Sequence, residues 1–127
     1  MAESQFDSLV TLAGRDAAAL QLLATDEDLL SPAFFHAQQA VEKVLKAVLS
    51  AKGINYPLTH DLILLKEALH RIGVVCPVSD SILKLLTPFG VQARYDEDIG
   101  AAQHLADIIA SVDLALSWCD AFQPTVR

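Results

Sequence analysis

The sequence lacks the features of membrane and exported proteins. No apolar run approaches the roughly 20 residues that would span a bilayer, and the opening MAESQFDSLV has neither the basic nor the apolar region of a signal peptide. Its two cysteines, Cys76 and Cys119, read as free thiols, and no Cys/His cluster has zinc-ligand spacing. We therefore expect a cytoplasmic protein without a membrane span, metal ion or cofactor.

Positive charge is also scarce. Nine lysines and arginines stand against 16 aspartates and glutamates, for a net charge of −7. Nucleic acids are bound mainly through lysine and arginine, so this composition argues against a general nucleic-acid binder. An acidic surface fits a basic protein partner, or solubility alone, better.

Alternating strand patterns are nearly absent, and helical spacing dominates. The chain has 127 residues, 53% of them apolar, which suits one domain, 1–127, with a sizeable core. The apolar spacing predicts an all-α fold, an antiparallel up-and-down bundle of four main helices plus one shorter helix. The expected main helices cover about 4–24, 32–52, 60–72 and 99–122, and the shorter one covers about 80–89.

Capping residues predict where these helices begin. Ser31 can cap the second helix with Pro32 at its first position, Thr59 can cap the third, and Ser79 or Asp80 the fourth. The last helix has an unbroken apolar stripe, which predicts one continuous element. That stripe consists of Ala101, Leu105, Ile108, Val112, Ala115, Cys119 and Phe122.

The second helix carries polar residues in unusual places. Gln38 falls inside its apolar arc, Glu42 lies at the edge, and Lys46 follows four residues later. A buried amide destabilises a fold unless it is hydrogen-bonded. Two interpretations stay open: a buried amide that bonds a loop or helix end, or a polar line Gln38–Glu42–Lys46 that faces a groove or a second subunit.

Other polar residues have plainer interpretations. The adjacent His60 and Asp61 suggest a metal or catalytic pair, but we favour capping and packing, because neighbouring residues on a helix point about 100° apart. His36, Lys43 and His70 fall on the outer faces of their helices, where we expect them to be solvated.

Three segments together resemble a known family. AFFHAQQAVEKVLKAVLSAKG, followed by LTHDL and then RYD, is similar to the minimal HEPN domains of bacteria and archaea, over roughly positions 8 to 120. The resemblance implies a helical bundle and frequent homodimers. It also implies nucleotide binding or work with a minimal nucleotidyltransferase, sometimes as one half of a toxin–antitoxin pair.

One large branch of that family consists of ribonucleases marked by an arginine, four to six residues, and a histidine. In QARYDEDIGAAQH, nine residues separate Arg94 from His104. On an unbroken helix the two would lie about 80° and about 15 Å apart, too far for one chain to hold one phosphate, whereas a break in the helix near Gly100 would bring them closer. The acids at 96–98 would repel RNA, and they suit a helix start, with Asp96 or Asp98 as its cap.

The leading hypothesis is therefore a non-catalytic HEPN protein, a homodimer that partners a nucleotidyltransferase. Arg94 could meet a phosphate and Tyr95 could stack on a base, while His104 reads as a boundary residue of the last helix. With Gln38, Glu42 and Lys46 they form the set of ligand-binding candidates, and no catalytic residue is assigned. The alternatives are a metal-independent ribonuclease toxin and a plain helical interaction module.

Overall fold

The structure, a computed structural model, describes residues 4–91 and 100–124, and every regular element in those ranges is helical. This confirms the all-α bundle. The α-helices are α1 (Gln5–Leu23), α2 (Leu30–Ala51), α3 (Leu62–Arg71), α4 (Asp80–Leu86) and α6 (Leu105–Cys119). The 3₁₀ turns are η1 (Glu27–Leu29), η2 (Thr87–Gly90) and η3 (Asp120–Phe122).

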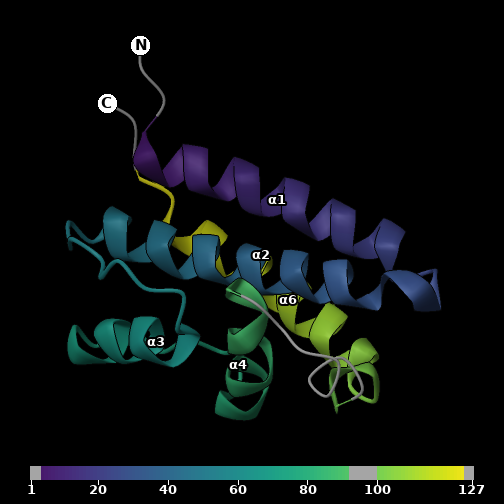
Figure 1. Ribbon diagram of the computed structural model, residues 1–127. Helices are drawn as coiled ribbons and strands as arrows, with labels where there is room; N and C mark the ends of the chain where they lie inside the picture. Colours follow the sequence, from purple (N-terminus) through teal and green to yellow (C-terminus); the bar gives the residue numbers. More distant parts are fainter. Residues whose placement is uncertain (1–3, 92–99, 125–127) are drawn as a thin grey trace.

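The central helix is α2. Figure 1 shows α1 above it, α3 and α4 below it and α6 behind it, and it contacts all four. Its apolar face is fully buried, and so are four alanines within that face or along its edge, which let neighbouring helices approach closely. Those alanines are Ala33, Ala37, Ala40 and Ala47.

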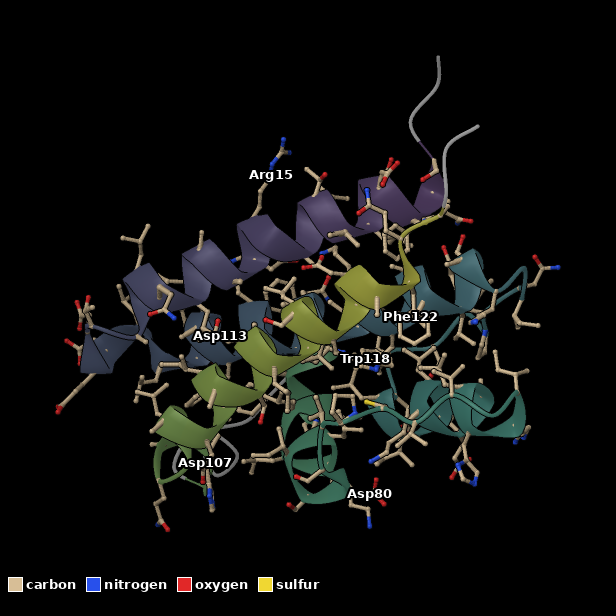
Figure 2. All side chains as sticks on the ribbon, turned by 180° about the vertical axis from the view of Figure 1, so that it is seen from behind. Arg15, Asp80, Asp107, Asp113, Trp118 and Phe122 are labelled. Atoms are coloured by element: carbon tan, nitrogen blue, oxygen red, sulfur yellow. The ribbon has the colours of Figure 1, made fainter. Side chains whose placement is uncertain are left out.

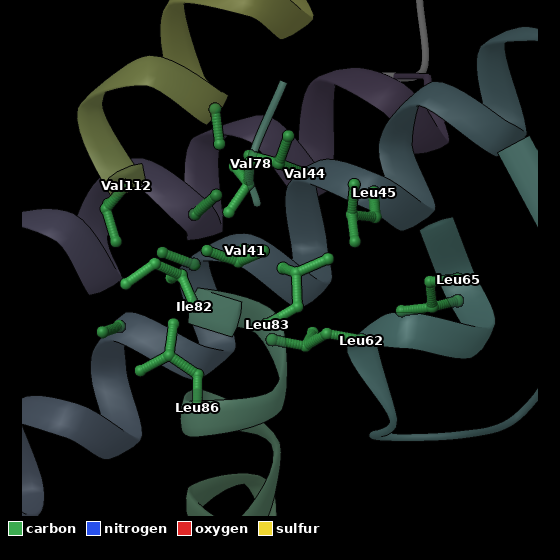
Figure 3. Packing of buried hydrophobic residues seen from close by; sticks show 14 of the residues in the cluster. Val41, Val44, Leu45, Leu62, Leu65, Val78, Ile82, Leu83, Leu86 and Val112 are labelled. Atoms are coloured by element: carbon green, nitrogen blue, oxygen red, sulfur yellow. The ribbon is translucent and has the colours of Figure 1, made fainter. Parts of the chain in front are cut away.

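One apolar cluster joins the helices. Val41 and Leu45 of α2 lie in it with Leu65 of α3, Leu83 of α4 and Val112 of α6 (Figure 3). The chain directions in Figure 1 make α1 antiparallel to both α2 and α6. Burial of these side chains is the main source of stability, at roughly 1.5–3 kcal/mol for each large one.

Two predicted helix starts are wrong. α2 begins at Leu30, before the expected cap Ser31, because η1 already turns the chain; its cap residue Leu29 makes no side-chain bond. Pro32 is tolerated in the first turn, where backbone N–H groups have no partner within the helix. α3 begins at Leu62 and not at 60, because Asp61 is its cap: its Oδ1 accepts from the Ile63 N–H at 3.0 Å.

The expected cap Thr59 is therefore not the cap of α3. It lies in the turn before the helix, where its Oγ1 accepts from the Asp61 N–H at 3.0 Å. The predicted cap Ser79 is confirmed by its bond from the Ile82 N–H, at 3.3 Å. Gly53 and Gly73 follow α2 and α3 with φ of 74° and 79°, a left-handed conformation that glycine adopts readily.

The last predicted helix is not continuous. A turn at Gln103 and His104 separates helical residues 100–102 from α6. The His104 N–H bonds the Ala101 carbonyl at 2.9 Å, a tight three-residue turn, and His104 then becomes the cap residue of α6. Periodicity could not reveal this break, because Ala101 and Ile108 are buried on both sides of it. The expected caps Asp96 and Asp98 lie outside the described residues.

Among the described helices, none is long and apolar enough to cross a membrane. Within the same residues no three His, Cys, Asp or Glu side chains are grouped so that they could hold a metal ion. Cys76 and Cys119 are both free and buried, as expected for structural thiols. Burial raises the pKa of the Cys119 thiol to about 11 and also raises that of Cys76, so both are poor nucleophiles.

Candidate functional site

Gln38 is fully buried on α2 and bonded at both ends of its amide. Its Nε2 donates to Glu42 Oε1 and to the His60 carbonyl, both at 2.9 Å, and its Oε1 accepts from Gln39 Nε2 at 2.8 Å. The last residue of η2 lies against it: a Cβ at Gly90 would stand 2.6 Å from Gln38 Nε2. Gln38 is thus a buried amide that ties α2 to the loop before α3, the first of its two interpretations.

Glu42 lies one turn further along α2 and is 5% exposed. Its Oε1 also lies 2.9 Å from His60 Nδ1, and its Oε2 accepts from Lys46 Nζ at 2.9 Å. Burial alone would raise the pKa of this carboxyl, but the hydrogen bonds from Gln38, Lys46 and His60 outweigh it and hold the pKa below its usual range. Glu42 is therefore an anion, and His60 must donate through Nδ1, because a carboxylate only accepts.

Lys46 ends this polar line beside an aromatic ring. Its Nζ lies 5.3 Å from the ring centroid of Tyr56, and its side chain is only 14% exposed. The Tyr56 hydroxyl in turn accepts from Gln5 Nε2 of α1 at 2.7 Å. The loop between α2 and α3 is therefore attached both to α2 and to the start of α1.

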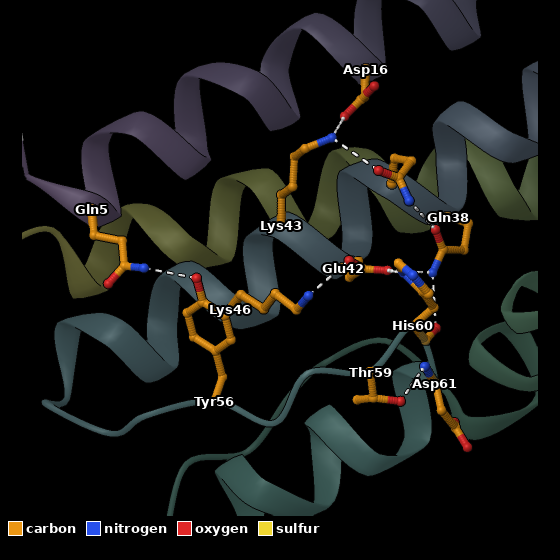
Figure 4. Close-up of polar contacts among 11 residues, drawn as sticks. Gln5, Asp16, Gln38, Glu42, Lys43, Lys46, Tyr56, Thr59, His60 and Asp61 are labelled. Atoms are coloured by element: carbon orange, nitrogen blue, oxygen red, sulfur yellow. Dashed lines mark hydrogen bonds and ion pairs between the residues drawn. The ribbon is translucent and has the colours of Figure 1, made fainter. Parts of the chain in front are cut away.

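A second buried carboxylate, Asp16 of α1, extends the line (Figure 4). Its oxygens accept from Lys43 Nζ at 2.6 Å and lie 2.8 Å from His36 Nδ1, so the expectation that His36 and Lys43 are solvated is wrong. Lys43 also donates to Gln39, which bonds Gln38. We call the connected side chains the α2 polar network: Asp16, His36, Gln38, Gln39, Glu42, Lys43, Lys46 and His60.

Sequence reasoning missed Asp16, although its position carried a signal. Asp16 lies three residues after Ala13 and four before Leu20, both buried, which places it on the packed face of α1. His60 and Asp61 behave as predicted, one in packing and one as a cap. What the spacing could not reveal is that His60, 18 residues from Glu42 in sequence, meets it through the fold.

His104 lies in a different part of the molecule. It caps α6, its side chain is 50% exposed, and its Nδ1 stands 4.0 Å from Asp107 Oδ2. It lines a hollow of about 400 Å³ between the start of α4 and α6, together with Ser79, Ser81 and Ser111, and no residue of the α2 polar network lines that hollow.

The structure thus brings Gln38, Glu42 and Lys46 together and keeps His104 apart from them. Arg94 and Tyr95 lie outside the described residues. In the structure, the polar atoms of Gln38, Glu42 and Lys46 bond other side chains or backbone of the same chain. Whether any of the six residues contacts a ligand stays a prediction.

Comparison with known proteins gives one match. The family model described as HEPN domain matches residues 7–121, nearly the whole chain. No curated protein matches the chain, and no solved structure does.

Proposed function

Because the chain belongs to the HEPN domain family, on a match over residues 7–121, we propose that it is a non-catalytic HEPN subunit. It pairs with a minimal nucleotidyltransferase, works as a homodimer, and binds a nucleotide near Arg94, Tyr95 and His104. If the two proteins form a toxin–antitoxin pair, this chain is one of its halves.

The observation that carries the non-catalytic part is that the buried Glu42 carboxylate of the α2 polar network is fully bonded within the chain. A general acid or base must offer a proton position to its substrate. Both oxygens of Glu42 are occupied, by Gln38 and His60 on one side and by Lys46 on the other. The Glu42 carboxylate thus joins α2 to the loop before α3, and its oxygens are not available to a substrate as a general base.

The proposal that the chain binds a nucleotide rests on the residue types found near His104. An arginine suits a phosphate and a tyrosine ring suits a base, and the two precede the half-exposed His104 in sequence. Titration of the purified protein with ATP and GTP tests it. Arg94→Ala and Tyr95→Ala should weaken binding about tenfold, whereas Arg15→Ala should not, since Arg15 points away from the bundle on α1 (Figure 2). If all three variants bound ATP and GTP as the wild type does, the proposal of nucleotide binding at this site would be wrong.

The partnership is tested first by the neighbouring reading frames, one of which should encode a nucleotidyltransferase. Co-expression followed by light scattering should then give a complex whose mass exceeds that of either protein alone. Two proteins that elute separately at micromolar concentration would contradict the pairing.

The ribonuclease alternative keeps one observation in its favour. The turn at Gln103–His104 removes the continuous helix on which the separation of Arg94 from His104 was calculated. Expression of the chain alone discriminates: growth arrest that His104→Ala abolishes, and that His70→Ala on the exposed face of α3 leaves intact, would favour the nuclease.

A further inference from the structure

The hollow beside His104 is lined by side chains that can bond a ligand. It encloses about 400 Å³ between the start of α4 and α6, and we call it the α4–α6 hollow. Its volume lies within the range of about 300–1,000 Å³ that is usual for binding sites. Its hydrogen-bonding oxygens are the hydroxyls of Ser79, Ser81 and Ser111 and the carboxylate of Asp107. Figure 2 shows Asp107 near the start of α6.

Two of these groups on α6 lack hydrogen-bond partners. Asp107 is 76% exposed, and the His104 imidazole stands 4.0 Å from its carboxylate, beyond hydrogen-bond distance. Within residues 4–91 and 100–124, neither the Asp107 carboxylate nor the Ser111 hydroxyl makes a hydrogen bond. The two residues lie four positions apart on one helix, so their side chains are neighbours on the same face. Unlike the oxygens of Glu42, these oxygens are available to a ligand.

The lining suits two of the three parts of a nucleotide poorly. Phosphates are held mainly by lysine and arginine, and none of the described residues that line the hollow is of either type. The Asp107 carboxylate would also repel a phosphate. A base is held by stacking on aromatic rings, and the described lining offers only the small imidazole of His104 for that purpose. The remaining part of a nucleotide is its ribose.

A ribose matches both the polar and the apolar side chains of the hollow. Its vicinal hydroxyls donate and accept hydrogen bonds, a carboxylate accepts from them, and a serine hydroxyl can do either. Dinucleotide-binding folds use a carboxylate on the ribose 2′-hydroxyl in the same way. The carbons of the sugar ring need apolar contact, and three apolar residues complete the described lining. They are Ile82, Ala110 and Leu114.

We propose that the α4–α6 hollow binds the ribose of the nucleotide, so that the protein selects ribonucleotides over 2′-deoxyribonucleotides. The Asp107 carboxylate accepts from the 2′-hydroxyl, and the Ser111 hydroxyl bonds the neighbouring 3′-hydroxyl. This inference rests on the proposed function, which supplies the nucleotide but not the part of it that α6 contacts. All the residues that it requires lie within the described ranges of the chain.

The test compares ATP with 2′-deoxy-ATP in calorimetric titration of the purified chain. The wild type should bind ATP about five- to tenfold more tightly, the effect of one hydrogen bond at an exposed site. Asp107→Ala should weaken ATP and leave 2′-deoxy-ATP unchanged, which brings the ratio of the two affinities close to one. Ser111→Ala should weaken both nucleotides to a similar extent, because both retain the 3′-hydroxyl.

Matched controls lie on the same helix. Asp113 and Ser117 are exposed on α6 and do not line the hollow, and Figure 2 shows Asp113 further along the helix than Asp107. Asp113→Ala and Ser117→Ala should therefore keep both wild-type affinities. Thermal melting should show that each variant folds. The ratio of ATP to 2′-deoxy-ATP affinity is the decisive readout, since damage to the fold would weaken both nucleotides alike.

The outcomes separate this inference from the proposal of nucleotide binding. A wild type that binds ATP and 2′-deoxy-ATP equally well would overturn the ribose inference and leave nucleotide binding in place. A preference for ATP that persists in Asp107→Ala would do the same, because the 2′-hydroxyl would then lie elsewhere. If Asp107→Ala changed only the ratio of ATP to GTP affinity, the base would occupy the hollow and the inference would be wrong. If the wild type bound none of these nucleotides, both proposals would be wrong.

Discussion

The α2 polar network and the surroundings of His104 place polar side chains in opposite situations. In the network, Glu42 is 5% exposed and each of its oxygens has a partner within the chain. Beside α6, the His104 side chain is half exposed, and the carboxylate of Asp107, three residues further along, stands 4.0 Å away. A polar residue on an apolar helix face is therefore not by itself a sign of a binding site. Saturated groups stabilise the fold, whereas exposed groups remain available to a ligand.

Removal of Glu42 should have the largest effect on stability. Glu42→Ala leaves Lys46 and the Gln38 amide buried without their shared partner, so we expect a loss of about 3–5 kcal/mol in the free energy of unfolding. Urea denaturation measures it. Asp113→Ala on the exposed side of α6 is the control and should change stability by no more than about 0.5 kcal/mol. A loss below 1 kcal/mol at Glu42 would mean that the network is not structural.

Gly90→Ala should have the next largest effect. The added methyl group would stand 2.6 Å from Gln38 Nε2, and the amide cannot retreat without breaking its bonds to Glu42 and His60. We expect a loss of about 1–3 kcal/mol, measured by the same denaturation. Gly14→Ala within α1 meets no atom within 4 Å and should stabilise by roughly 0.5–1 kcal/mol. If Gly90→Ala and Gly14→Ala changed the free energy of unfolding in the same direction, this account of Gly90 would be wrong.

Acidification should weaken the network more gradually. The pKa of Glu42 is lower in the folded than in the unfolded state, so its ionisation stabilises the protein above the unfolded pKa, about 4.3. That contribution is lost as the pH falls through the lower folded value. We expect the difference in unfolding free energy between the wild type and Glu42→Gln to shrink from pH 7 to pH 3. A difference that is constant over this range would show that Glu42 is not the group that titrates.

His104→Ala should have the smallest effect on stability. The side chain is half exposed and makes no cap bond to α6, so the free energy of unfolding should change by no more than about 0.5 kcal/mol. If this region binds a nucleotide, the same variant should still weaken binding in the titration with ATP and GTP. A large loss of stability with unchanged nucleotide binding would show that His104 is a structural residue, like those of the α2 polar network.

Local sequence patterns predicted the helices well because they depend on nearby residues. Spacing of apolar residues identified every described α-helix, and Ser79 was recognised as a cap. Two other starts were misplaced by two residues. α2 begins early because η1 already turns the chain, and α3 begins late because Asp61 caps it, with Thr59 in the turn before. The break at His104 escaped prediction because it leaves the apolar stripe intact.

The sequence by itself determined the fold class, the acidic surface and the unusual placement of Gln38, Glu42 and Lys46 on one helix. Only the tertiary structure decided what those side chains do. Their partners, His60 and Tyr56, come from a loop outside α2, and the neighbouring Lys43 pairs with Asp16 of α1. Hydrogen bonds between residues distant in sequence have no periodic signature, because they depend on how helices are placed in space.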